Sequence, residues 1–204
     1  MKFYIVHPVR ESILSQIAEF PPIVMTLAGA DPSGGAGIQA DILTLASLGC
    51  HPLSVITAVT VQDTRSVENF WVMDAEQVSD QARFLLEDMP VSVFKVGMIG
   101  SVENAAVIAE IAADYPDVPL ILDPVLASGG GDELAREELC EAIRDLLLPL
   151  TTLVTPNSIE ARRLAASNPD EEDELSLPQA AQRLLQAGVE YVLITGTHDN
   201  TVQG

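Results

Sequence analysis

Hydrophobic and polar positions along the chain follow two alternating patterns. Short continuous apolar runs predict strands at 23–27, 53–61, 67–73, 91–96, 120–122, 152–154 and 191–194. Apolar residues at three- and four-residue spacing predict helices at 38–48, 74–88, 101–113, 133–148, 158–166 and 178–187. Continuous apolar strands that alternate with helices are typical of a mainly parallel sheet with helices on both faces. We therefore expect an α/β fold, a three-layer α/β/α sandwich.

Three segments depart from this alternation. The consecutive β-rich segments 53–61 and 67–73 predict a small hairpin or flap beside the main sheet. Residues 1–22 carry apolar positions at helical spacing that stop at two prolines, so we expect an N-terminal appendage before a single domain over 23–204. The acidic segment 167–176 is expected to be a solvated loop without function.

Composition narrows the class of protein. A chain of 204 residues with 48% hydrophobic residues can bury a sizeable core. It has no apolar run of transmembrane length, and its first 22 residues do not have the pattern of a signal peptide, so the cytoplasm is the expected location. Cys50 and Cys140 are too few for a disulfide framework and are expected to be buried, and the scattered histidines make a zinc site unexpected.

The net charge of −20 excludes further classes of partner. With 30 acidic residues, 10 basic residues and only two lysines, the surface should repel nucleic acid and anionic membranes. A nucleotide ligand would need Mg²⁺ and local positive dipoles. Excess acid with little lysine suits either a salt-tolerant source organism or an ordinary acidic cytosolic protein. A salt titration of stability would separate these two readings.

The run at 28–41, AGADPSGGAGIQAD, follows the first predicted strand and opens into a predicted helix. Its glycines allow a close approach of backbone to a small ligand, and a strand, a Gly-rich turn and a helix N-terminus form a ligand-binding corner in α/β sheets. The spacing is neither that of a dinucleotide site nor that of a Walker A loop. The pattern alone leaves open a ligand-binding corner or a tight turn with incidental glycines.

Polar residues follow other predicted strands at the sheet edge where ligands bind in open α/β folds. Gln62 could donate to and accept from a heterocycle edge, and Met98 could form an apolar wall. Asp123 and Glu160 could hold Mg²⁺ directly or through water, together with phosphate oxygens. The alternatives are ordinary ones: a strand-end polar residue, a core methionine, a turn residue before proline and a carboxylate that complements a helix dipole.

The run at 28–41 resembles the opening signature of the hydroxymethylpyrimidine/phosphomethylpyrimidine kinases of thiamine biosynthesis, in the ribokinase-like superfamily. Further similar motifs follow in the family's order: SVITA (54–58), VQDT (61–64), KVGM (95–98), LDPV (122–125), TPNSIE (155–160) and ITGTH (194–198). The resemblance covers residues 23 to about 198. It implies a ribokinase-like fold, ATP and Mg²⁺ as cofactors, and a small pyrimidine as substrate. Because the family commonly forms dimers, a homodimer is one expectation.

The resemblance also implies roles by position. The residues implied for the pyrimidine pocket are Gly29, Asp41, Gln62, Met98 and Val125. Asp123, Asn157 and Glu160 would organise Mg²⁺ and the ATP phosphates, with Asp123 and Glu160 as metal ligands, while Thr195 and Gly196 would lie on the nucleotide side. The implied reaction transfers the γ-phosphoryl group of ATP to the hydroxymethyl oxygen and then to the monophosphate.

Two features differ from the family pattern. Thr195 stands where many relatives carry lysine. The Gly-rich anion hole, with the Cys or Asp nearest the reacting hydroxyl, is expected beyond Gly204, so the C-terminal part of the fold is predicted to be missing. Either this sequence is part of a longer enzyme, or the product is truncated, or a partner chain completes the site. The alternatives to the pyrimidine kinase are a pyridoxal-type vitamin kinase and a non-catalytic pyrimidine-binding remnant.

Overall fold

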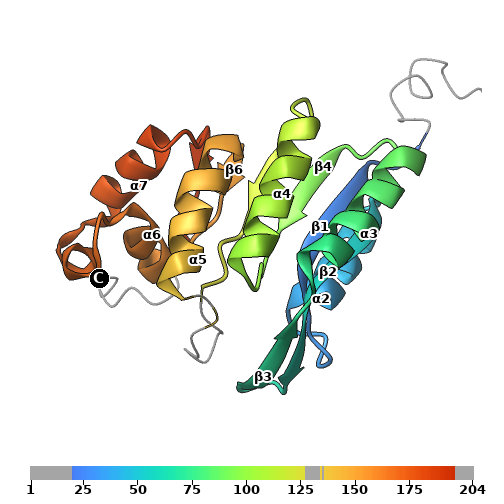
Figure 1. The fold of residues 1–204 in the computed structure, drawn as a ribbon, viewed down its shortest axis with the longest axis horizontal. Helices are drawn as coiled ribbons and strands as arrows, with labels where there is room; N and C mark the ends of the chain where they lie inside the picture. The colour runs from blue at the N-terminus through green and yellow to red at the C-terminus, as the bar shows by residue number, and fades with distance from the viewer. Residues whose placement is uncertain (1–19, 127–133, 135, 196–204) are drawn as a thin grey trace, which may run out of the picture.

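The computed structural model describes residues 20–126, 134 and 136–195. Its centre is a seven-stranded sheet in the order β3-β2-β1-β4-β5-β6-β7 (Figure 1). The strands are β1 Ile23–Ala30, β2 His51–Gln62, β3 Val67–Val72, β4 Val93–Val96, β5 Leu120–Leu122, β6 Leu153–Val154 and β7 Tyr191–Val192. Every neighbouring pair is parallel except β2 with β3. The expectation of a mainly parallel α/β sheet is confirmed.

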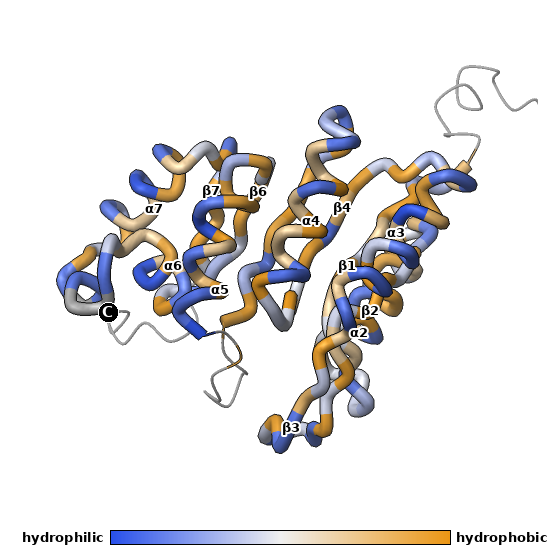
Figure 2. The backbone as a smooth tube through the Cα atoms, in the orientation of Figure 1, coloured by the Kyte–Doolittle hydropathy of each residue, from blue (hydrophilic) through white to orange (hydrophobic). Residues whose placement is uncertain are grey.

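The helices follow the strands as the periodicity predicts. They are α2 Gly37–Ser47, α3 Ala75–Asp88, α4 Val102–Asp114, α5 Glu137–Ala142, α6 Ser158–Ala165 and α7 Leu177–Gln186. Glycines with positive φ follow α2 and α7, at Gly49 and Gly188, in the usual C-terminal role of glycine. Figure 2 shows hydrophobic and hydrophilic residues alternating along α4 and α7. Among the described residues, no helix combines the length and the apolar character that a membrane crossing requires.

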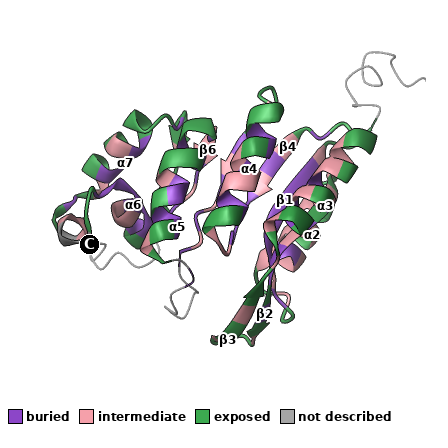
Figure 3. Cartoon of the chain, viewed as in Figure 1, coloured by how far each residue is buried: buried purple, intermediate pink, exposed green. Residues whose placement is uncertain are grey.

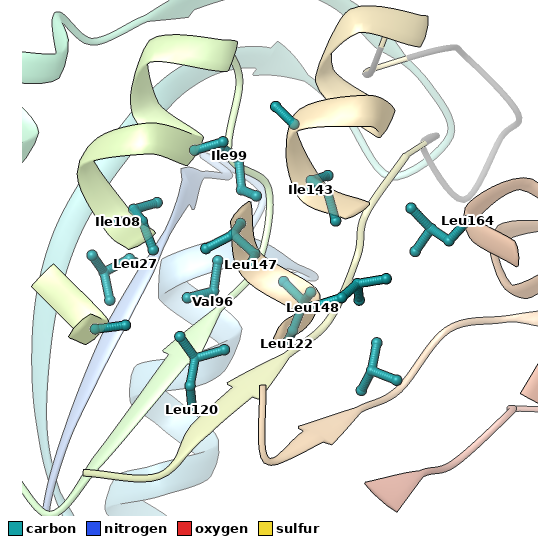
Figure 4. Close-up of a cluster of buried hydrophobic side chains, with 14 of the residues drawn as sticks. Leu27, Val96, Ile99, Ile108, Leu120, Leu122, Ile143, Leu147, Leu148 and Leu164 are labelled. Atoms are coloured by element: carbon teal, nitrogen blue, oxygen red, sulfur yellow. The ribbon is translucent and has the colours of Figure 1, made fainter. Parts of the chain in front are cut away.

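The two faces of the sheet are covered differently. Alternate residues of β1 and β4, such as Leu27 and Val96, point into one large apolar cluster that includes side chains from α3 to α7 (Figure 4). The opposite face of β1 and β2 is covered by α2, whose residues are not part of that cluster. Helices therefore lie on both faces of the sheet. Most of the buried core lies between the sheet and the face that α4 and α5 cover (Figure 3).

The expected flap belongs to the main sheet instead of standing beside it. The first part of β2 pairs in parallel with β1, and its last residues pair antiparallel with β3. The hairpin thereby projects past the end of β1, and β3 is mostly exposed (Figures 1 and 3). The sequence could not show this because one strand supplies both pairings, and pairing partners lie far apart in the chain.

The helix predicted at 133–148 is wrong in its extent. Leu134 is not helical, and its N–H donates to Leu126 O. The α-helix begins at Glu137, continues as a π-helical turn over Ile143–Leu147 and ends in a 3₁₀ turn over Leu148–Leu150.

The acidic segment forms a 3₁₀ helix over Pro169–Glu174, in which Glu171 accepts a hydrogen bond from Arg183. The predicted appendage, apart from its last residues, lies outside the described residues.

The two cysteines differ in burial, against the expectation that both are buried. Cys140 is fully buried, and this burial raises the pKa of its thiol to about 11, whereas Cys50 is only partly buried. Because the thiolate is the reactive form, native protein treated with iodoacetamide at pH 8 should be alkylated at Cys50 and not at Cys140. Peptide mass spectrometry checks this, with denatured protein as the control in which both thiols react. Rapid alkylation of Cys140 in the native protein would contradict its burial.

Candidate active site

A cavity of about 320 Å³ opens at the carboxyl ends of β1, β2, β4 and β5. This volume is in the range of small-molecule sites. Its lining includes six residues that the resemblance implied for ligand or metal: Gly29, Asp41, Gln62, Met98, Asp123 and Val125. These residues are far apart in sequence and meet because parallel strands end at the same edge of the sheet. The structure thus brings them together, while the role of each stays a prediction.

The Gly-rich run forms the corner of this cavity. Asp31 is 2% exposed, and its Oδ2 accepts hydrogen bonds from Ala36 N at 2.8 Å and Ser33 Oγ at 3.0 Å. Its Oδ1 accepts from Ser33 N at 2.7 Å. Gly37 begins α2 with φ of +57°, and a Cβ there would overlap the carbonyl oxygen of Gly29. Carboxylate and glycine together hold the loop against the end of β1.

Asp41 lies in α2 and faces the cavity beside Lys95 of β4. Its Oδ2 accepts two hydrogen bonds, from the Thr26 hydroxyl at 2.5 Å and from Lys95 Nζ at 2.9 Å. Thr26 and Lys95 are register partners on the α2 face of the sheet. Both donors use the same carboxylate oxygen, which leaves Oδ1 without a partner among the described residues. An ionised carboxylate with one free oxygen can accept a hydrogen bond from a ligand N–H.

Asp123 follows β5 and is the second carboxylate beside Lys95. Its Oδ2 lies 3.8 Å from Lys95 Nζ, and its side chain is 42% exposed. Desolvation raises the pKa of Asp123, the Lys95 ammonium lowers it and the Asp41 carboxylate raises it. Desolvation is the largest of these causes, so this carboxyl gains from a cation that approaches from the cavity.

Hydrogen bonds from Thr57 and Asn104 hold the turn that carries Met98, an apolar residue of the cavity lining. A Cβ on Gly29 would lie 3.0 Å from Met98 Sδ, so the glycine leaves room for the methionine. The Thr57 hydroxyl donates to Met98 O, and the buried Asn104 amide donates to Thr57 O at 3.3 Å and to Ile99 O at 3.1 Å. These bonds fix the turn after β4 and therefore the position of Met98.

Asn157, Glu160 and Thr195, which the resemblance implied for the nucleotide side, are not among the residues that line this cavity. Asn157 is the N-cap of α6, and Glu160 completes a capping box with it. Glu160 is 7% exposed; its Oε2 accepts from Asn157 N at 2.9 Å and its Oε1 from Leu126 N at 3.3 Å. Thr195 forms a bridge with Asn157, and its N–H donates to Pro156 O at 2.8 Å. Gly196 lies outside the described residues.

The donor set fits Mg²⁺ at Asp123 better than at Glu160. Mg²⁺ is usually bound by one or two carboxylates together with substrate phosphates and water. Asp123 faces the cavity with a partly exposed carboxylate, whereas both Glu160 oxygens already accept backbone hydrogen bonds. Within the described ranges, no group of three or more His, Cys, Asp or Glu is suited to hold a metal. The metal role of Glu160 stays a prediction.

The sequence analysis did not single out Lys95, which lines the cavity, or Thr26, whose hydroxyl donates to Asp41. A signal for Lys95 was present, because it is one of two lysines in the chain and interrupts an apolar strand. Phe94 and Val96 are buried in the core, so strand alternation puts Lys95 on the opposite face. Nothing comparable marks Thr26, since a threonine inside a strand is ordinary.

The chain is similar to proteins of one family over most of its length. A family model described as phosphomethylpyrimidine kinase matches residues 31–203. A hydroxymethylpyrimidine/phosphomethylpyrimidine kinase of Streptomyces coelicolor is 42% identical over 178 residues. The alignment covers 87% of this chain and 65% of that relative, so the chain spans about two thirds of the relative's length.

Solved structures agree with this similarity. The phosphomethylpyrimidine kinase of Clostridium difficile superposes with a TM-score of 0.75 at 34% identity, over 88% of this chain and 77% of that chain. A pyridoxal kinase from Staphylococcus aureus in complex with pyridoxal has a TM-score of 0.73 at 28% identity, over 87% of this chain and 65% of that chain. The same pyridoxal kinase has also been solved with ADP and with AMP-PCP.

Proposed function

Because the chain belongs to the phosphomethylpyrimidine kinase family, we propose that it binds 4-amino-5-hydroxymethyl-2-methylpyrimidine and serves its ATP-dependent phosphorylation, and that of its monophosphate, in thiamine biosynthesis. The observation that carries the proposal is the cavity at the strand ends. It combines a carboxylate with one free oxygen, Asp41, with the amide of Gln62 and an apolar wall that includes Met98 and Val125. A flat ring with polar edges needs such surroundings.

Each residue of the site would have its own role in binding the pyrimidine, the metal ion or the nucleotide. Asp41 Oδ1 would accept a hydrogen bond from the ring's amino group, and Gln62 would offer both a donor and an acceptor to another edge. Asp123 would hold Mg²⁺, which when bound neutralises charge on the transferring phosphoryl group. The N-terminus of α6, with Asn157 and Thr195 near it, would lie toward the nucleotide. Met98 and Val125 would exclude water from the ring faces.

A pyridoxal-type kinase is the second candidate, because pyridoxal is also a flat ring with a hydroxymethyl group. The structural similarity to the Staphylococcus aureus enzyme supports it, at lower identity than the pyrimidine kinases. Comparing turnover of the two substrates with ATP and Mg²⁺ tests the choice, and a preference for pyridoxal would overturn it. Binding of the pyrimidine without any nucleotide binding would instead favour the non-catalytic remnant.

The remaining proposals concern partners and place. The net charge of −20 supports a small-molecule ligand and argues against nucleic acid and anionic membranes. A cytoplasmic location is proposed from the sequence pattern, and a homodimer from the family resemblance alone. Size-exclusion chromatography with light scattering tests the dimer, and a monomer at micromolar concentration would contradict it.

Replacing Asp41 with alanine should weaken pyrimidine binding more than it destabilises the fold. Losing a charge-assisted hydrogen bond should lower the affinity by about 10- to 100-fold, as measured by calorimetry. Asp114→Ala is the matched control, since Asp114 also forms an ion pair at 2.8 Å, with Arg83, on the exposed surface. That control should leave pyrimidine affinity unchanged. A large fall in melting temperature with unchanged affinity for Asp41→Ala would show a purely structural role.

A further inference from the structure

The cavity is acidic and contains a single lysine. Its lining includes the carboxylates Asp31, Asp41 and Asp123, and Lys95 is the only Lys or Arg among the described lining residues. The oxygens of Asp31 accept hydrogen bonds from groups of its own loop. Asp41 and Asp123, by contrast, lie on either side of the Lys95 ammonium. A phosphomonoester carries a charge of about −1.5 to −2 at neutral pH. Without Lys95 these carboxylates would repel such a ligand.

The neighbourhood of Lys95 leaves its ammonium able to donate further. Lys95 Nζ donates to Asp41 Oδ2 at 2.9 Å, while Asp123 Oδ2 at 3.8 Å is beyond hydrogen-bond distance. An ammonium has three donors, and the described residues use one of them. Gly97 provides the space, because a Cβ at that position would lie 3.0 Å from Lys95 Nζ. The lysine can therefore reach along its own strand to the cavity.

The chemistry of the proposed substrate places its reactive arm near this ammonium. In 4-amino-5-hydroxymethyl-2-methylpyrimidine, the amino group and the hydroxymethyl group sit on adjacent ring carbons. A ring whose amino group donates to Asp41 therefore brings the neighbouring arm close to that carboxylate. Lys95 Nζ lies 2.9 Å from Asp41 Oδ2 and 3.8 Å from Asp123 Oδ2. An ammonium between these two carboxylates would therefore lie beside the hydroxymethyl arm of a ring bound in this way.

We propose that Lys95 binds the phosphate of the monophosphate substrate and so makes the acidic cavity accept both the alcohol and its phosphate ester. This inference rests on the proposed function, because it assumes the two successive substrates. The ammonium offsets the carboxylates when the phosphate enters, and it donates a charge-assisted hydrogen bond that the neutral alcohol does not need. Lys95 thereby acts on the second substrate far more than on the first.

The test compares binding of the two ligands to wild type and to Lys95→Met, by calorimetry in EDTA without nucleotide. We expect the variant to bind the monophosphate about 10- to 100-fold more weakly than wild type does. The fold-loss in affinity for the alcohol should be at least ten-fold smaller than the fold-loss for the monophosphate. Lys95→Gln serves as a second uncharged variant if the methionine variant does not fold. Lys95→Arg, which keeps the charge, should retain more of the monophosphate affinity than either.

Thr26→Val is the matched control, because it removes the other hydrogen bond to the same Asp41 oxygen without changing charge. It should affect both ligands equally. An equal loss for both ligands in Lys95→Met would overturn the inference while leaving the proposed function intact, and would mean that Lys95 only holds Asp41. A wild-type protein that binds neither ligand would overturn the proposed function, and the inference with it.

Discussion

Replacing Gly37 with alanine is expected to lower the free energy of unfolding by about 3 kcal/mol or more and to abolish pyrimidine binding. Two costs combine at this position. The backbone has φ of +57°, which L side chains rarely adopt, and the new Cβ would overlap Gly29 O and lie 3.3 Å from Gly29 C. Because both neighbours are backbone at the cavity corner, relief requires the loop to move away from β1. Urea denaturation and calorimetry measure the two effects.

Gly34→Ala separates the two costs within the same loop. Gly34 also has positive φ, of +76°, but a Cβ there meets nothing within 4 Å. Only the conformational strain remains, which costs about 1–2 kcal/mol, and pyrimidine affinity should change little. Equal effects of the two substitutions on stability and binding would show that the close approach of Gly37 to Gly29 is unimportant.

The second large effect is expected for Asp31→Asn, a substitution of nearly the same shape. Asp31 accepts hydrogen bonds from Ser33 N on one oxygen, and from Ala36 N and Ser33 Oγ on the other. An amide has one acceptor atom, so the backbone N–H of Ser33 or that of Ala36, both now bound by the buried Asp31 carboxylate, loses its partner. The expected loss is about 2–3 kcal/mol of unfolding free energy, with weaker pyrimidine binding because Ala36 and Gly37 line the cavity.

Asp63→Asn is the matched control for this prediction. Asp63 Oδ1 alone accepts from Arg65 N at 2.8 Å and Ser66 N at 3.0 Å in an exposed turn. An asparagine oxygen can accept both bonds, so the midpoint of urea unfolding should change little. If Asp31→Asn were as mild as Asp63→Asn, the buried carboxylate would not be what holds the Gly-rich loop.

Most strands and helices could be predicted from the sequence because their signals are local. Each such signal depends only on residues a few positions away in the chain. Examples are the apolar run that begins at Ile23, the glycine that follows α2 and the N-cap serine at Ser101. Ser101 Oγ, for example, accepts a hydrogen bond from Asn104 N at 3.2 Å and so caps α4. Boundaries were less predictable: β1 extends to Ala30, and α5 starts at Glu137, while the N–H of Leu134 donates to Leu126 O.

The sequence named several of the residues that line the cavity, and their roles stay predictions. Motif resemblance named Asp41, Gln62 and Met98, and the structure places them around one cavity. The same resemblance put Glu160 with the metal, which stays a prediction; the structure adds that its oxygens accept hydrogen bonds from the backbone N–H groups of Asn157 and Leu126. A motif reports which residues recur and does not say which of their atoms are already engaged.

By itself, the sequence determined the order of strands and helices, the strand-to-helix turn at the Gly-rich run and the polar strand ends, since these depend on periodicity and on the conformations that glycine allows. Only the tertiary structure decided that β2 pairs with both β1 and β3, and that Lys95 meets an aspartate 54 residues earlier, Asp41, with Asp123 beside them. Such contacts depend on sheet register and on which face a side chain takes, and both are set by pairings between residues far apart in the chain.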